Sequence, residues 1–166
     1  MELAALSIGS NIGQRELYIE AMERELQLIL ADVRMSRLME TEPVGVDGDQ
    51  PDYLNRIVAG YCDTSPHELL QSCLEIEKRL GRIREKVKDS RTADIDILLF
   101  GNLAINSAEL TVPHPQILVR RFCIEGLFQI DRGWIVPGVN KSAEELRGEM
   151  SAEVKAQKIY FIADKL

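Results

Sequence analysis

Apolar residues recur along the chain at two spacings, and these spacings predict which segments form strands and which form helices. Short runs of β-branched and other apolar residues bounded by turn residues are typical of strands, whereas apolar residues three or four positions apart mark one face of a helix. The strands expected on this basis are 3–9, 33–40, 53–62 and 94–100, with 103–106 pairing back on the last of them as a hairpin. The helices expected are 15–30, 65–81 and a third that runs from about 117 to 130.

The segment 65–81 carries the clearest helix signals. Ser65 can cap the first turn, Pro66 suits the first helical position, and Glu68 completes a capping box. Gly81 is a natural terminator because glycine readily adopts the left-handed conformation that ends a helix. Together these residues predict both ends of the helix.

The order of the expected elements predicts the architecture. Strand, helix, two strands, helix and strand follow one another, which indicates an α+β sandwich: a mostly antiparallel sheet with helices packed on one face. Segments 42–52 and 82–91 are expected as long loops, and the mixed pattern after residue 130 places no element. We expect a single domain over residues 1–166.

Composition and charge narrow the class of protein. The net charge of −7 disfavours nucleic-acid and membrane-surface partners, and no apolar run approaches the ~20 residues of a membrane span. The N-terminus has an early Glu2 and no basic stretch, so we expect no signal peptide. Cys62, Cys73 and Cys123 lack CxxC spacing and have apolar neighbours, which fits core packing in a reducing compartment. We therefore expect a cytoplasmic protein, and we take it to be a monomer.

The strand in SRTADIDILLF (90–100) carries two carboxylates, Asp94 and Asp96, among apolar residues. Side chains two positions apart in a strand point to the same face, so these carboxylates lie side by side. Two ionised carboxylates repel unless one is protonated or a cation lies between them. Such a pair suits Mg²⁺, which prefers few carboxylates together with waters and phosphate oxygens. The alternatives are that each Asp pairs with a nearby Arg or lies at an exposed strand end.

A cluster of cations precedes this pair in an otherwise acidic chain. Its members lie within ten residues of one another and are Arg82, Arg84, Lys86, Lys88 and Arg91. Cations beside a carboxylate-bound metal make a polyphosphate site, although each of them taken singly could belong to a solvated loop. His114 is held between two prolines and could donate to a phosphate or be structural. The segment GSNIG lacks the GK[ST] ending of a P-loop, so it does not indicate that phosphate site.

Five segments in this order and spacing make the chain resemble a known enzyme family. They are SIGSNIG, TEPVGVDGDQPDYLN, EIEKRLGRIR, SRTADIDILLFG and LTVPHPQILVRRF. The family is 6-hydroxymethyl-7,8-dihydropterin pyrophosphokinase of folate biosynthesis, and the resemblance covers about residues 5–130. It implies a ferredoxin-like α/β sandwich, and it implies transfer of pyrophosphate from ATP to the hydroxymethyl group of the dihydropterin, with release of AMP.

The resemblance also implies a role for individual residues. Asp94 and Asp96 would hold two Mg²⁺ ions, and Arg82 and Arg91 would act with them in catalysis. The residues implied to contact ATP are Glu77, Arg82, Arg84, Arg91, Ile97, Thr111, His114 and Arg120. Those implied to hold the pterin, with Tyr53 and Phe122 stacking on its two faces, are Thr41, Pro43, Val44, Tyr53, Asn55 and Phe122.

One segment departs from the pattern of the family. Where members commonly carry an RWGPRT-like run before the Asp pair, this chain reads KVKDSRT and lacks the Trp and the Gly-Pro turn. The departure keeps a second hypothesis open, namely a non-catalytic nucleotide- or pterin-binding paralogue with an altered lid loop. A third hypothesis is a ferredoxin-like interaction module, which predicts no Mg²⁺-dependent ATP binding.

Overall fold

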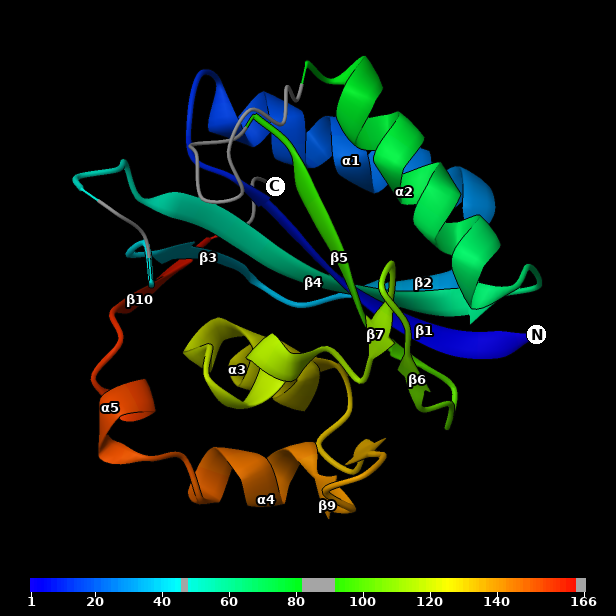
Figure 1. The fold of residues 1–166 in the computed structure, drawn as a ribbon. Coiled ribbons are helices and arrows are strands. Elements are labelled where there is room, and N and C mark those ends of the chain that lie inside the picture. Colours follow the sequence, from blue (N-terminus) through cyan, green and yellow to red (C-terminus); the bar gives the residue numbers. More distant parts are fainter. Residues whose placement is uncertain (46–47, 82–91, 164–166) are drawn as a thin grey trace.

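A computed structural model gives the fold and describes residues 1–45, 48–81 and 92–163 (Figure 1). The main sheet consists of β1 (Glu2–Ser10), β2 (Ala31–Met35), β3 (Leu38–Thr41), β4 (Tyr53–Cys62), β5 (Asp94–Phe100) and β10 (Ile159–Ile162). Its strands run in the order β10-β3-β4-β1-β5, and β2 also pairs with β4. Every pairing in the sheet is antiparallel. The α+β sandwich expected from the sequence is confirmed.

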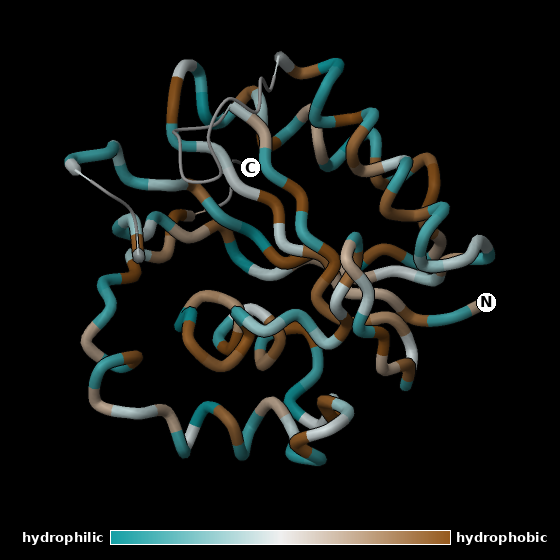
Figure 2. Tube along the Cα trace, in the orientation of Figure 1, coloured by the Kyte–Doolittle hydropathy of each residue, from teal (hydrophilic) through white to brown (hydrophobic). Residues whose placement is uncertain are grey.

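Helices cover both faces of the sheet, whereas the sequence pattern predicted them on one face. Helices α1 (Arg15–Ile29) and α2 (Pro66–Arg79) pack on one side, and α3 (Arg121–Ile130) and α4 (Ala143–Gly148) lie on the other (Figure 1). Alternate strand residues divide accordingly, with Leu6 and Val58 in the α1–α2 core and Ala5 and Ile57 in the α3 core. In Figure 2 the central strands carry mostly hydrophobic positions. Burial on both faces explains why these strands contain nearly continuous apolar runs.

The expected strand 33–40 is divided by a bulge into β2 and β3. Between the pairs Met35–Val58 and Met39–Asn55, four steps on this strand match three on β4. The buried Ser36 lies at the bulge, where its hydroxyl accepts a hydrogen bond from Ile57 N at 2.9 Å. An extra residue of this kind bends the strand.

Two further expectations need correction after β5. Residues 105–106 (β6, Ile105–Asn106) pair with β7 (Thr111–Val112) instead of returning to β5. The third helix is divided into the 3₁₀ segment η1 (Pro115–Leu118) and α3. The remaining C-terminal elements, which the sequence pattern did not place, are β8 (Ile135–Val136), β9 (Lys141–Ser142), α4, α5 (Ala152–Lys155) and β10.

The other helices follow the sequence signals closely. Ser65 caps α2 by accepting from Glu68 N at 3.2 Å, and Glu68 accepts from Ser65 N at 2.8 Å, so the predicted capping box is present. In the part of the chain that the structure describes, no helix is both long enough and apolar enough to cross a bilayer.

Candidate functional site

A cavity of about 290 Å³ lies on the α3 face of the sheet, between β1, β4 and β5 on one side and η1 and the start of α3 on the other. Strands supply its floor, and the segments after β3 and β7 supply its walls. The described residues that line it are Ser7, Thr41, Glu42, Val44, Gly45, Tyr53, Asn55, Asp94, Asp96, Leu98, His114, Gln116, Arg120, Phe122 and Cys123.

Strand register builds the floor of this cavity. Gly9 on β1 pairs with Asp94 on β5 at one side and with Asn55 on β4 at the other, and Ser7 pairs with Asp96. Because side chains alternate along a strand, these residues all face α3. A Cβ on Gly9 would come within 2.6 Å of Asn55 Oδ1, so the absence of a side chain there leaves room for Asn55. Asn55 Nδ2 in turn donates to Thr41 Oγ1 at 2.6 Å, with both residues buried.

The acidic side of the cavity is formed by Asp94 and Asp96, both half-buried. His114 Nε2 lies 4.0 Å from Asp96 Oδ1, and His114 Nδ1 accepts a hydrogen bond from Gln116 N at 3.1 Å. Burial lowers the pKa of His114 below its ordinary value, and the charge of Arg120 lowers that pKa further, while Asp94 opposes the shift. The imidazole is therefore neutral near pH 7, and because its Nδ1 is an acceptor, its proton is on Nε2, facing Asp96.

The opposite side of the cavity is formed by η1 and the first turn of α3. Arg120 Nε donates to Gln116 Oε1 at 3.1 Å, so Gln116 links Arg120 to His114. Phe122 is only 9% exposed and packs into the α3 core while lining the cavity. Burial raises the pKa of the Cys123 thiol to about 12, so this group stays protonated and is a poor nucleophile.

The donor set of the cavity fits a divalent cation shared with a ligand. Among the residues that the structure describes, no cluster of three or more His, Cys, Asp or Glu side chains could hold a metal by itself. Asp94 and Asp96 offer two oxygen donors on one strand face, and the neighbouring His114 is neutral. Mg²⁺ characteristically binds one or two carboxylates and completes its shell with waters and phosphate oxygens. The arrangement thus suits a metal that arrives with a phosphate-bearing ligand.

Most of the residues predicted from the sequence meet at this cavity. Those that line it are Thr41, Val44, Tyr53, Asn55, Asp94, Asp96, His114, Arg120 and Phe122. Pro43 and Thr111 lie on neighbouring segments and are not among the residues that line it. Arg82, Arg84 and Arg91, with Lys86 and Lys88, fall outside the described residues.

Two predicted ATP contacts lie in the α1–α2 half of the molecule. Glu77 is buried on α2, and its Oε2 accepts a hydrogen bond from Ile95 N at 3.1 Å, which ties α2 to β5. The side chain of Ile97 is 3% exposed and belongs to the α1–α2 core, facing away from the cavity. Any contact of Ile97 with a nucleotide in the cavity would therefore have to use its backbone.

Sequence reasoning missed several residues that line the cavity. These are Ser7, Glu42, Gly45, Leu98, Gln116 and Cys123. Two of them carried a usable signal. Ser7 lies in SIGSNIG, one of the segments that carry the family resemblance, and Gln116 lies four positions before Arg120 in the same turn-rich segment.

Comparisons with known proteins agree on one family. A family model described as 7,8-dihydro-6-hydroxymethylpterin-pyrophosphokinase (HPPK) matches residues 5–132. The chain is 39% identical to the 2-amino-4-hydroxy-6-hydroxymethyldihydropteridine pyrophosphokinase of Bacillus subtilis over 130 residues. These residues make up 77% of each chain. It is 35% identical over 144 residues to the protein of that name from Synechocystis, covering 86% of this chain and 73% of that one.

Solved structures agree in fold. A crystal structure of Plasmodium falciparum HPPK-DHPS with pteroate superimposes with a TM-score of 0.73 at 14% sequence identity. The match covers 93% of this chain but only 45% of that longer chain. At this level of identity the likeness supports the fold alone.

Proposed function

Since the chain belongs to the 7,8-dihydro-6-hydroxymethylpterin-pyrophosphokinase family, we propose that its cavity carries out that family's reaction. Pyrophosphate is transferred from ATP to the hydroxymethyl group of 6-hydroxymethyl-7,8-dihydropterin, a step of folate biosynthesis. The hydroxymethyl oxygen bonds to the β-phosphorus of ATP and loses its proton. The bond from that phosphorus to the α–β bridging oxygen breaks, and AMP leaves.

One observation carries the proposal. The cavity places two adjacent carboxylates, Asp94 and Asp96, within the same space as the aromatic residues Tyr53 and Phe122 and the cation Arg120. Carboxylates and a cation suit a metal-bound polyphosphate, and aromatic side chains suit a flat heterocycle. Both substrates of the transfer therefore have matching chemistry in one site.

Asp94 and Asp96 are the residues that would hold Mg²⁺, and we propose two ions. When bound, Mg²⁺ neutralises phosphate charge and lowers the pKa of the attacking hydroxyl. Arg120 and the Nε2–H of His114 then donate to phosphate oxygens, as their positions on the cavity wall allow. Such transfer needs positioning and charge neutralisation more than covalent help. Arg82, Arg84 and Arg91 are assigned to the same phosphates by their place in the sequence.

The remaining assignments concern the two substrates. Tyr53 and Phe122 stack on the pterin, and Asn55 hydrogen-bonds its edge together with groups of Thr41, Pro43 and Val44. The proximity of Asn55 to Thr41 supports this, because their hydrogen bond orients the amide within the cavity. Glu77, Ile97 and Thr111 stay predictions for the nucleotide side. We propose that the protein acts as a monomer, and its three free buried thiols suit a reducing cytoplasm.

Gly9→Ala should weaken pterin binding while leaving the fold intact. The new Cβ would come within 2.6 Å of Asn55 Oδ1, the end of a side chain that can rotate away, so the cost falls on the orientation of the amide. We expect the KM for the pterin to rise roughly tenfold, the scale of one lost hydrogen bond to a ligand. Steady-state kinetics measure this. Gly148→Ala, where a Cβ meets nothing within 4 Å, is the matched control, and an unchanged KM in Gly9→Ala would exclude Asn55 from the pterin contact.

The direct test of the proposed function is release of AMP. The protein is incubated with ATP, Mg²⁺ and 6-hydroxymethyl-7,8-dihydropterin, and AMP is followed by chromatography. AMP formed in equal amount with the dihydropterin diphosphate supports the proposal. Tight binding of both substrates without AMP would overturn it in favour of the non-catalytic binder, and no Mg²⁺-dependent ATP binding at all would favour the interaction module.

A further inference from the structure

Gln157, in the segment before β10, forms hydrogen bonds with the backbone on both sides of Arg120. Gln157 Oε1 accepts a hydrogen bond from Arg121 N at 2.9 Å, and Gln157 Nε2 donates to Val119 O at 2.8 Å. The two bonds span 36 and 38 residues of sequence. One amide side chain therefore fixes the residue before Arg120 and the residue after it, much as a neighbouring strand would.

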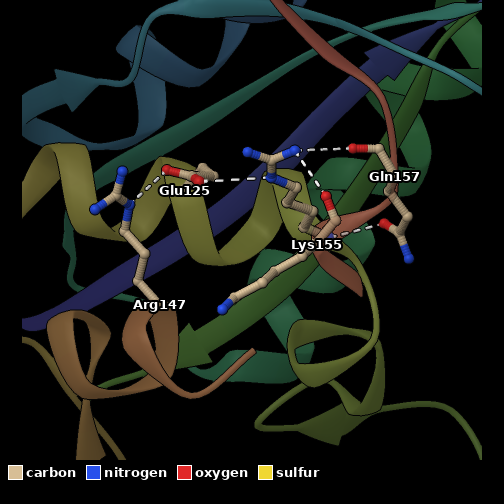
Figure 3. Close-up of polar contacts among 5 residues, drawn as sticks. Glu125, Arg147, Lys155 and Gln157 are labelled. Carbon is tan, nitrogen blue, oxygen red and sulfur yellow. Dashed lines mark hydrogen bonds and ion pairs between the residues drawn. The ribbon is translucent and has the colours of Figure 1, made fainter. Parts of the chain in front are cut away.

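A second set of contacts returns from α3 to the same segment. The Arg121 guanidinium donates to Lys155 O and Gln157 O, both at 3.0 Å. Glu125, one turn further along α3 and only 5% exposed, lies 3.6 Å from Arg121 Nε and accepts from Arg147 Nε of α4 at 2.9 Å. Figure 3 shows Glu125 beside Arg147, and the dashed contacts that reach Lys155 and Gln157. The C-terminal elements are thus held to the first turn of α3 by charged and amide groups.

The first turn of α3 needs such support because its own sequence supplies no cap. Arg120 occupies the N-cap position and makes no capping hydrogen bond with its side chain. The first N–H groups of a helix have no partner inside the helix, and arginine is not among the residues that cap well. The guanidinium of Arg120 has no acceptor and cannot cap the helix, so Gln157 supplies the acceptor for Arg121 N from outside, while Arg120 lines the cavity.

The same segment also holds the opposite rim of the cavity. Lys158 N donates to Glu42 Oε1 at 3.2 Å, and Ile159 pairs with Thr41 where β10 joins β3. Glu42 and Thr41 both line the cavity. Residues 157–159 therefore connect the wall assigned to phosphates with the wall assigned to the pterin.

We propose that Gln157 is a positioning residue that acts through Arg120, setting the place from which the guanidinium meets the phosphates of ATP. The proposal rests on the proposed function, since it assumes that ATP binds in this cavity. Gln157 lies beyond residues 5–132, the part that the family model matches. The C-terminal segment thereby acquires a role in the site.

Gln157→Met tests the proposal, because methionine keeps the length of the side chain and removes both hydrogen bonds. We expect kcat/KM for ATP to fall roughly tenfold or more, as misplacement of a binding group does. The control is Gln129→Met on α3: the Oε1 of Gln129 accepts a hydrogen bond from Arg37 N at 2.8 Å, at the end of α3 remote from Arg120. Gln157→Met loses two hydrogen bonds to backbone and Gln129→Met loses one, so Gln157→Met should lower the melting temperature somewhat more, but only Gln157→Met should lose activity.

A double-mutant cycle separates positioning from general stability. In an Arg120→Ala background, Gln157→Met should change kcat/KM for ATP less than about twofold, because the group through which it acts is gone. Equal losses in both backgrounds, or wild-type activity in Gln157→Met, would overturn the inference. Absence of AMP from the wild-type protein would instead overturn the proposed function. In that case hydrogen exchange at the Arg121 amide tests the positioning role of Gln157. Loss of the hydrogen bond from Arg121 N to Gln157 should make exchange faster in Gln157→Met, and unchanged exchange would refute that role.

Discussion

Replacing Asp96 by asparagine should abolish pyrophosphoryl transfer, with kcat lowered by roughly a thousandfold or more. The substitution keeps the shape of the side chain and removes a negative charge from the acidic side of the cavity. Asp96 pairs with Ser7 on β1 and is half-buried, so the sheet does not depend on its charge for packing. We expect the variant to stay folded, with a melting temperature close to that of the wild type.

Two measurements separate a metal role from a structural one. The Mg²⁺ concentration for half-maximal residual activity should rise in Asp96→Asn, and the Mg²⁺ dependence of ATP binding should shift to higher concentration in the same way. Asp63→Asn, an exposed position beyond the far end of β4, is the matched control and should behave like the wild type. Near-normal turnover in Asp96→Asn with an unchanged Mg²⁺ requirement would exclude the metal assignment and favour pairing of the carboxylate with an arginine.

Local signals in the sequence were sufficient to place the two carboxylates of β5. Alternation along residues 94–100 predicted that Asp94 and Asp96 share a face, and the register of β5 on β1 gives them that place beside Ser7 and Gly9. The bounds of β4 and β5 agree with the prediction, because both strands end at clear breaks in the apolar pattern. The spacing of apolar residues and the presence of turn-forming residues are local properties, so they can be recognised directly in a sequence.

Contacts between distant segments could not be predicted in the same way. Gln157 meets Val119 and Arg121 across more than thirty residues, and β10 joins β3 through Ile159 and Thr41. The segment around Gln157 shows no strong period, so nothing local marks it as part of the site. The helices on the second face of the sheet were missed for a related reason. A strand that is buried on both faces is distinguished from one buried on a single face only by apolar residues on the second face, such as Ile57. The residues that cover Ile57 belong to α3, which is distant in sequence.

The close approach of α3 to the sheet has a single residue at its centre. Gly126 faces Ile57 of β4, and a Cβ on Gly126 would overlap Ile57 Cγ1 and lie 2.9 Å from Ile57 Cβ. Ile57 is fully buried, so it has no free space to move into. Glycine at this position therefore allows the helix to lie on the sheet, and with it Phe122 and Cys123, which line the cavity from the same helix.

Gly126→Ala should be strongly destabilising, although alanine is the better helix former by about 1 kcal/mol. Overpacking of this kind costs about 1–3 kcal/mol or more, and because the overlap falls on a buried β-branched side chain we expect the upper end, with the melting temperature lowered by roughly 5–10 °C. Because α3 must move away from β4, the KM for the pterin should rise as well. Denaturant unfolding and steady-state kinetics measure the two effects.

A compensating change tests whether the overlap with Ile57 is the cause. Ile57→Ala removes Cγ1 and leaves a cavity by itself, so each single variant should be destabilised. In the double variant, the methyl group added by Gly126→Ala occupies the space that Ile57→Ala leaves. The double variant should therefore be more stable than the sum of the two single losses predicts. Gly148→Ala at the end of α4, where a Cβ meets nothing within 4 Å, should be neutral or slightly stabilising. Strict additivity of the two changes, or wild-type stability of Gly126→Ala, would show that α3 is not seated on the sheet through this contact.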